Sequence, residues 1–202
     1  MSRILIGVTG NVASGKSVVA RHFQEKGCAL VDADKVAHEL YATNTGLLRQ
    51  LASEFGSEIM NPDGTLNRKR LGHEVFGDAE ALMALDRIVH PHLLVALRER
   101  IFTARRVMNR AVLDAALIVE WGARREMDCL VLVTAPEEVR LRRLMERDGL
   151  SMDEASRRIR SQIPEDDKRP FADFEITNTG TPEQLLEKAD AVWQAIEAKF
   201  AE

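Results

Sequence analysis

The residues with the clearest chemical use form a glycine-rich loop at positions 10–17, which reads Gly-Asn-Val-Ala-Ser-Gly-Lys-Ser. Its spacing is that of a phosphate-binding loop, or P-loop, whose backbone N–H groups surround phosphate oxygens. In such a loop Lys16 would reach the terminal phosphates of a nucleotide, and Ser17 would ligate Mg²⁺. The residues expected to bind the nucleotide are Gly10, Asn11, Val12, Ala13, Ser14, Gly15, Lys16 and Ser17.

The segments on either side of the loop favour this interpretation over an incidental glycine-rich turn. An apolar run, Ile4–Thr9, leads into the loop and predicts a strand, and residues 18–26 have a helical pattern. A helix that starts at the loop would add the positive end of its dipole to the phosphate site. The strand, loop and helix context that a P-loop requires is therefore present.

Acidic side chains follow the next apolar run, at Asp32 and Asp34. Ligands of open α/β sheets bind at the carboxyl ends of strands, so one of these acids could face a phosphoryl acceptor. Transfer to a hydroxyl needs a group that accepts the hydroxyl proton, and we assign that role to Asp34. The alternative is that both acids only cap a helix that begins at Lys35. Asp114, after a later strand, is a weaker candidate for an acid that supports Mg²⁺.

A basic segment with a helical pattern covers residues 139–147. On a helix, Arg140, Arg143 and Arg147 share one face. Their guanidinium groups could neutralise charge on the transferring phosphoryl group, and a helical lid could exclude water from it. Such runs are more often solvated helix faces, but the P-loop makes the phosphate-facing interpretation the stronger one.

Near-continuous apolar runs predict parallel strands that are buried on both faces, at residues 4–9, 29–32, 111–113, 130–134 and 174–178. Capping-box spacing predicts helix starts after Thr134, Ser151 and Thr181. An apolar stripe from Leu185 to Phe200 is expected to pack in the core. The chain therefore reads as an α/β protein with a parallel sheet.

The block between the second and third predicted strands has no strand pattern. Its helical patterns are interrupted by the turn sequence Asn-Pro-Asp-Gly at 61–64 and by His90-Pro91. Because it is too long for a plain crossover, the block at 43–106 predicts a small helical subdomain.

Bulk properties narrow the class of protein. The 202 residues suffice for one substantial core, and 45% hydrophobic with 30% charged residues is ordinary for a globular chain. A formal charge of −4 argues against broad attraction to nucleic acid or to acidic membranes.

The cysteines and the absence of a targeting pattern predict the location. Cys28 and Cys129 are expected to be buried free thiols of a reducing compartment. Because the sequence shows no signal-peptide pattern and no long apolar span, the chain is expected in the cytoplasm.

Taken in order along the chain, these residues resemble the dephospho-coenzyme A kinase family. The segments that carry the resemblance are VTGNVASGKS, VDADKVA, PDGTLNRKRLGHEVF, the HP at 90–91, the ALIVE at 116–120, RRLMERDGLSMDEASRRIRSQ and ADFEITNTG. Many kinases and ATPases share the P-loop alone. The ordered set is more specific, above all Asp32-x-Asp34 together with Arg158-x-x-x-Gln162, Lys168, and Ala172-Asp173 leading to Asn178-x-Gly180.

The resemblance implies ATP-dependent phosphorylation of the ribose 3′-hydroxyl of dephospho-coenzyme A, which gives coenzyme A and ADP and completes coenzyme A biosynthesis. It implies a three-layer P-loop kinase fold with a five-stranded parallel sheet. The nucleotide-binding core would cover 1–42, 107–139 and 169–202, a coenzyme A-side insertion 43–106, and a lid 140–168. The implied catalytic residues are Asp34, Lys16, Arg143 and Arg147. ATP and Mg²⁺ are the implied cofactors, and Asn178 takes an adenine-side position.

Two departures from the family pattern and several rival functions bear on this interpretation. Ala116 stands where the family usually has proline, and Asn11-Val12-Ala13 replaces the commoner Gly-Ile-Gly. Another small-molecule or nucleoside monophosphate kinase would share the P-loop, the base and the arginines, but not the insertion and the later motifs. A regulatory GTPase would need Asn-Lys-x-Asp and Asp-x-x-Gly, which the sequence lacks. The expected partners are dephospho-coenzyme A and ATP, without nucleic acid or membrane, and the patterns leave the oligomeric state open.

Overall fold

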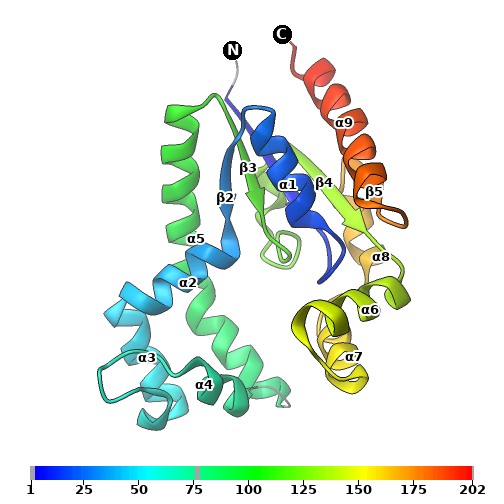
Figure 1. Ribbon diagram of the computed structural model, residues 1–202. Helices are drawn as coiled ribbons and strands as arrows, with labels where there is room; N and C mark the ends of the chain where they lie inside the picture. The colour runs from blue at the N-terminus through cyan, green and yellow to red at the C-terminus, as the bar shows by residue number, and fades with distance from the viewer. Residues whose placement is uncertain (1–2, 76–77, 202) are drawn as a thin grey trace. The chain divides into compact units, whose positions relative to one another are not determined.

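The computed structural model describes residues 3–75 and 78–201, so Phe76 at the end of PDGTLNRKRLGHEVF lies outside the described residues. The chain divides into two compact units. The first contains Met1–Asp32 and Ile101–Glu202, and the second contains Ala33–Arg100. Each unit has its own hydrophobic core. Figure 1 traces the elements of both units by residue number.

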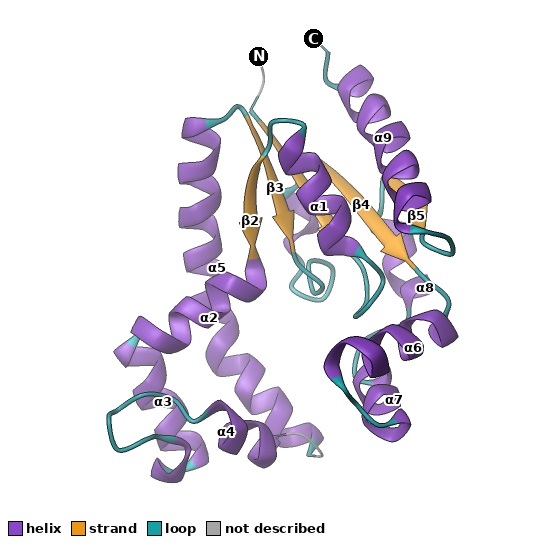
Figure 2. Cartoon of the chain, in the orientation of Figure 1, coloured by secondary structure: helices purple, strands orange, loops and turns teal. Residues whose placement is uncertain are grey.

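The first unit is built on a five-stranded parallel sheet in the order β2-β3-β1-β4-β5. This confirms the predicted α/β class and its sheet. The strands, drawn as orange arrows in Figure 2, are β1 (Ile4–Thr9), β2 (Ala29–Asp32), β3 (Arg110–Asp114), β4 (Cys129–Thr134) and β5 (Phe174–Thr177). The central strand β1 is buried along its whole length, which is why its sequence is apolar rather than alternating.

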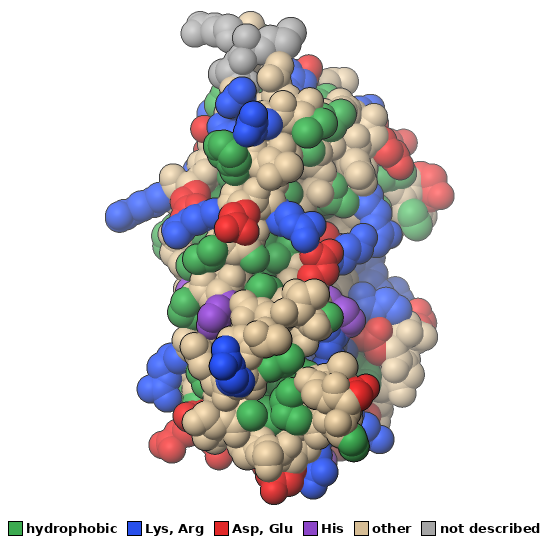
Figure 3. Space-filling model, turned by 90° about the vertical axis from the view of Figure 1, so that its left-hand side faces the viewer, with side chains coloured by type: hydrophobic (Ala, Val, Ile, Leu, Met, Phe, Trp, Pro, Cys, Tyr) green, Lys and Arg blue, Asp and Glu red, His purple; other side chains and the backbone are tan. Residues whose placement is uncertain are grey.

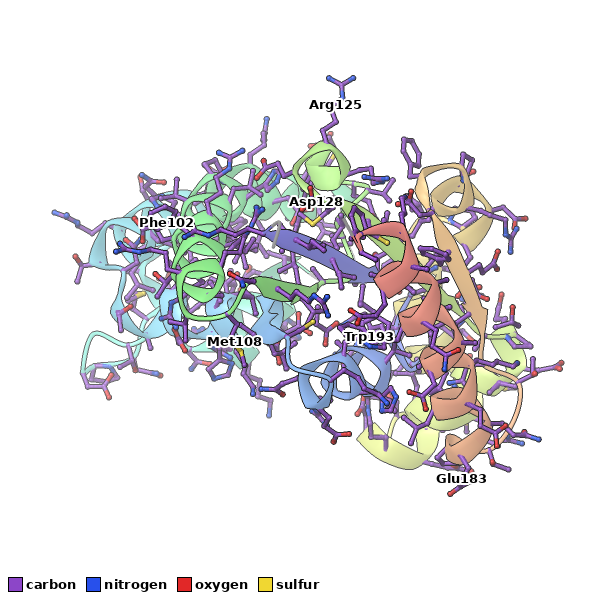
Figure 4. The ribbon with its side chains drawn as sticks, turned by 90° about the horizontal axis from the view of Figure 1, so that it is seen from above. Phe102, Met108, Arg125, Asp128, Glu183 and Trp193 are labelled. Atoms are coloured by element: carbon purple, nitrogen blue, oxygen red, sulfur yellow. The ribbon has the colours of Figure 1, made fainter. Side chains whose placement is uncertain are left out.

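One face of the sheet is covered by α1 (Lys16–Glu25) and α9 (Pro182–Lys199). Ile4, Ile6 and Val8 point to this face, as the two-residue period of a strand requires. The apolar stripe predicted on the last helix, α9, packs against this face. Trp193 of α9 points toward α1 (Figure 4), and its ring centroid lies 5.4 Å from that of Phe23.

Cys28 and Cys129 are buried free thiols, as predicted. Burial raises the pKa of Cys28 to about 11 and that of Cys129 to about 12. Both side chains therefore stay protonated at neutral pH and act as small apolar groups of the core.

Two of the three predicted capping boxes are confirmed. Ser151 with Glu154 caps α7 (Met152–Arg160), and Thr181 with Gln184 caps α9. The third prediction, at Thr134, is wrong because Pro136 starts α6 (Glu137–Asp148) with its fixed backbone angle. Thr134 remains the last residue of β4, and its hydroxyl bonds to side chains of β5 instead.

The connections of the first unit use short helices. They are η2 (Ala123–Glu126), α8 (Glu165–Lys168) and η3 (Arg169–Phe171). The helices α8 and η3 lead from α7 back to the edge strand β5, so the chain returns to the sheet after the helix pair α6 and α7.

The second unit is helical, with α2 (Ala33–Thr43), α3 (Thr45–Phe55), η1 (Ser57–Ile59), α4 (Arg68–Val75) and most of α5 (Ala79–Val107). The turn at 61–64 interrupts the helices as predicted, closed by a bond from the Gly64 N–H to the Asn61 carbonyl. The predicted break at His90-Pro91 is wrong, since α5 continues through Pro91. Proline removes one helix hydrogen bond, and buried Val89 and Leu93 on either side anchor the helix across it.

The surface shown in Figure 3 carries Lys and Arg side chains interspersed with Asp and Glu, and apolar groups are scattered among them. No broad patch of one charge covers that face. In the described part of the chain, no helix combines the length and the apolarity needed to cross a bilayer.

Candidate active site

The P-loop joins the carboxyl end of β1 to the start of α1, and its glycines are sterically required. Gly10 has φ 151° and Gly15 has φ 101°, values that L side chains rarely adopt. A side chain at Gly10 would overlap the carbonyl oxygen of Val133, and one at Gly15 would overlap the amide of Asn178. The loop therefore lies directly against β4 and against the residue that follows β5.

Backbone N–H groups are left available around this loop. The Ser14 N–H bonds to the Asn11 carbonyl and closes a turn. Within residues 3–75 and 78–201, the structure shows no protein acceptor for the N–H groups at positions 13, 15, 16 and 17. Several free amides at a helix N-terminus make an anion site, and the geometry fits a polyphosphate.

Lys16 is paired with a buried acid at the end of β3. Its Nζ lies 2.7 Å from Asp114 Oδ1 and 3.4 Å from Ser17 Oγ. The side chains of Lys16 and Asp114 are only 12% and 4% exposed, so the pair is held with little freedom. The Asp114 carboxylate thus holds the ammonium group beside the loop, close to the hydroxyl expected to ligate Mg²⁺.

Arg143 reaches the P-loop from α6. Its Nη1 donates to the Ala13 carbonyl at 3.1 Å, and its Nη2 donates to Asn178 Oδ1 at 3.1 Å. Burial, together with the neighbouring Arg142 charge, lowers the pKa of Arg143, but a guanidinium of this kind stays protonated. The structure therefore places Arg143 at the loop, and its phosphate-facing role stays a prediction.

The other two arginines of the predicted face have different surroundings. Arg147 is 62% exposed and donates Nε and Nη2 to Asp148, at 2.7 and 2.9 Å, which raises the pKa of Arg147. Arg140 is buried and donates to the Ala135 carbonyl. One helix face thus carries a buried, a loop-bound and a solvent-exposed guanidinium, and a phosphate contact by Arg147 stays a prediction.

Asn178 lies directly after β5 and is buried. Its Nδ2 donates to the Ser14 carbonyl at 2.8 Å, and its Oδ1 accepts from Arg143. The Asn178 side chain therefore bridges the P-loop and Arg143 by hydrogen bonds. The adenine-side role of Asn178 stays a prediction.

The backbone at Ala116, where the family usually has proline, is held by side chains. Its carbonyl accepts from Thr9 Oγ1 at 3.0 Å and from Lys168 Nζ at 2.7 Å. Lys168 is fully buried and also pairs with Glu120 at 2.9 Å. These bonds restrain the segment after β3 without the stiffness of a proline ring.

Asp34 belongs to the second unit and is exposed. The helix expected to begin at Lys35 begins at Ala33, so Asp34 lies inside the first turn of α2 rather than at its cap. An acid there is favoured by the helix dipole. Asp34 comes two residues after the end of β2, and its role as the base stays a prediction.

Two contacts of the loop were not predicted from the sequence. The first is the pair of Lys16 and Asp114, which depends on the strand order that puts β3 beside β1. The second is the bond from the Val12 N–H to Gln162 Oε1, at 2.7 Å. The only signal for Gln162 was its place in the family motif.

Comparisons with known proteins agree with this geometry. The family model described as dephospho-CoA kinase matches residues 4–184. A dephospho-CoA kinase of Anaeromyxobacter dehalogenans is 42% identical over 189 residues, which are 92% of this chain and 89% of that protein. A dephospho-CoA kinase of Corynebacterium jeikeium is 40% identical over 192 residues, which are 94% of this chain and 98% of that protein.

Solved structures with a similar fold include a dephospho-CoA kinase. A protein of Thermus thermophilus is similar with a TM-score of 0.80 and 34% identity, over 99% of both chains. A dephospho-CoA kinase from Campylobacter jejuni has a TM-score of 0.63 and 28% identity, over 95% of this chain and 96% of its own. A shikimate kinase from Acinetobacter baumannii, 18% identical with a TM-score of 0.54, shares the fold alone. Because the family model covers residues 4–184 and relatives of 40% and 42% identity match most of the chain, this chain belongs to the dephospho-CoA kinase family.

Proposed function

We propose that this protein transfers the γ-phosphoryl group of ATP to the ribose 3′-hydroxyl of dephospho-coenzyme A, giving coenzyme A and ADP. The observation that carries the proposal is a P-loop with free backbone amides and a positioned lysine, in a chain that belongs to the dephospho-CoA kinase family.

The loop geometry supports the donor side of the proposed reaction. Loop N–H groups bind phosphate oxygens, and Lys16 is held by Asp114 within reach of the same space. Arg143 adds a positive charge that is fixed to the loop carbonyls. Because these charges are in place before the reaction, they stabilise the charge that develops on the transferring phosphoryl group.

The residues at the loop also suit Mg²⁺, which prefers oxygen ligands. The Ser17 hydroxyl would hold the ion, with the Asp114 carboxylate as a further oxygen near the same lysine. The bound ion would neutralise charge on the β- and γ-phosphates.

The acceptor side requires a group that takes the proton of the ribose hydroxyl, and we assign it to Asp34. Its carboxylate is exposed on the first turn of α2 and is free of a structural core role. General-base assistance of this kind contributes about 10²–10⁴-fold in rate. The buried free thiols and the family support a location in the cytoplasm as part of the same proposal.

The proposal is tested by measuring ADP release with Mg²⁺-ATP and a panel of acceptors. We expect dephospho-coenzyme A to stimulate turnover strongly, whereas adenosine monophosphate and a small alcohol such as shikimate leave it near the rate without acceptor. Equal ATP hydrolysis with and without dephospho-coenzyme A, or better use of a nucleoside monophosphate, would refute the assignment.

A further inference from the structure

The P-loop is bonded to the segment that follows α7. The Val12 N–H donates to Gln162 Oε1 at 2.7 Å, and Asn11 Nδ2 donates to the Ile163 carbonyl at 2.9 Å. Asn11 is buried, and its bond to Ile163 is partly shielded from water. Two consecutive loop residues are thus held by two consecutive residues of the α7 exit.

Apolar contacts join the same parts of the chain. Leu144 of α6 and Ala155 and Ile159 of α7 form a small core of their own, and Val12 and Ala13 pack against it. Ala13 has φ 62°, a left-handed conformation that favours glycine. Although glycine would suit this backbone angle, position 13 carries the methyl group of Ala13, which packs between the loop and the helix pair α6 and α7.

These contacts use different backbone groups of the loop. The Ala13 and Ser14 carbonyls accept from Arg143 and Asn178, and the Val12 N–H is taken by Gln162. The N–H groups from position 13 onward need no displacement of Gln162 to bind phosphate. Gln162 thus bonds to Val12, outside the set of N–H groups at positions 13, 15, 16 and 17 that have no protein acceptor among the described residues.

We propose that Gln162 is a positioning residue of the nucleotide site. Its amide oxygen holds the Val12 N–H, so the loop conformation that binds phosphate is coupled to the packing of α6 and α7. Coupling of this kind is reciprocal, and ATP must in turn stabilise the packed helix pair. The proposal rests on the proposed function only for the identity of the nucleotide, because it does not depend on the acceptor.

The test compares Gln162→Leu with Gln184→Leu. Gln184 is a matched control because its Oε1 also accepts a backbone N–H, that of Thr181 at 3.0 Å, in the cap of α9. Gln162→Leu is expected to raise the Kd for ATP, measured by titration calorimetry, about 3- to 10-fold, the range that one hydrogen bond covers. The KM for dephospho-coenzyme A should change less than about twofold, and Gln184→Leu should leave the Kd for ATP unchanged.

A second measurement reads the helix pair directly. ATP should slow backbone hydrogen exchange in α7 of the natural protein, and Gln162→Leu should remove most of that protection. An unchanged or tighter Kd in Gln162→Leu, an equal rise in Gln184→Leu, or ATP-induced protection that survives the substitution would each overturn the proposal. Since ATP binding is measured without an acceptor, failure of the acceptor assignment would leave these results intact.

Discussion

Lys16→Ala is expected to lower kcat by about 100-fold or more, by analogy with the loss of other single electrostatic donors in preorganised sites. The ammonium group lies 2.7 Å from Asp114 and is largely shielded from water. Its charge should act on the developing phosphoryl charge with little screening. Steady-state turnover with Mg²⁺-ATP and dephospho-coenzyme A measures the effect.

Lys26→Ala is the matched control for this substitution. Lys26 follows the same helix and pairs with Asp190 at 2.7 Å, but that pair is exposed and should contribute little. Because Lys16→Ala also leaves a buried carboxylate without its partner, urea unfolding is measured in parallel and rates are expressed per folded protein. A kcat within about threefold of the natural protein would contradict the phosphate role of Lys16.

Asp34→Asn should keep ATP binding and lose most of the turnover, by about 10²–10⁴-fold in kcat. An amide has nearly the shape of the carboxylate but cannot accept the hydroxyl proton. Asp34 is exposed and lies in the first turn of α2, so the substitution removes no core contact. The Kd for ATP and kcat are measured on the same preparation.

The control is Asp63→Asn, which makes the same chemical change in the second unit. Asp63 bonds to Thr65 in the exposed turn before α4, remote in sequence from the P-loop and from Asp34. We expect its kcat to stay within about twofold. If Asp34→Asn also kept full activity, Asp34 would lose its role as the base.

The strands of this fold were predictable because parallel strands buried on both faces leave continuous apolar runs. β1 and β2 have the predicted bounds, and the other strands differ by one residue at one or both ends. The P-loop was equally clear, since the glycine spacing reflects backbone angles and close approaches that the structure shows at Gly10 and Gly15.

Contacts between elements distant in the sequence could not be predicted. The pair of Lys16 and Asp114 depends on the strand order, and the bond from Arg143 to Asn178 joins residues from α6 and from the end of β5. The prediction at Pro91 failed because burial on both sides of the proline outweighs one lost hydrogen bond. Local patterns identify residues suited to the chemistry, whereas their partners are set by packing.

The position of the transferred phosphoryl group decides whether this protein phosphorylates the ribose 3′-hydroxyl of dephospho-coenzyme A. The product formed from Mg²⁺-ATP and dephospho-coenzyme A would be isolated and examined by ³¹P and ¹H NMR. We expect a new phosphomonoester whose phosphorus couples to the ribose H3′, in an amount equal to the ADP formed. A phosphomonoester at the 2′-oxygen, or ADP formed with inorganic phosphate and unchanged dephospho-coenzyme A, would contradict it.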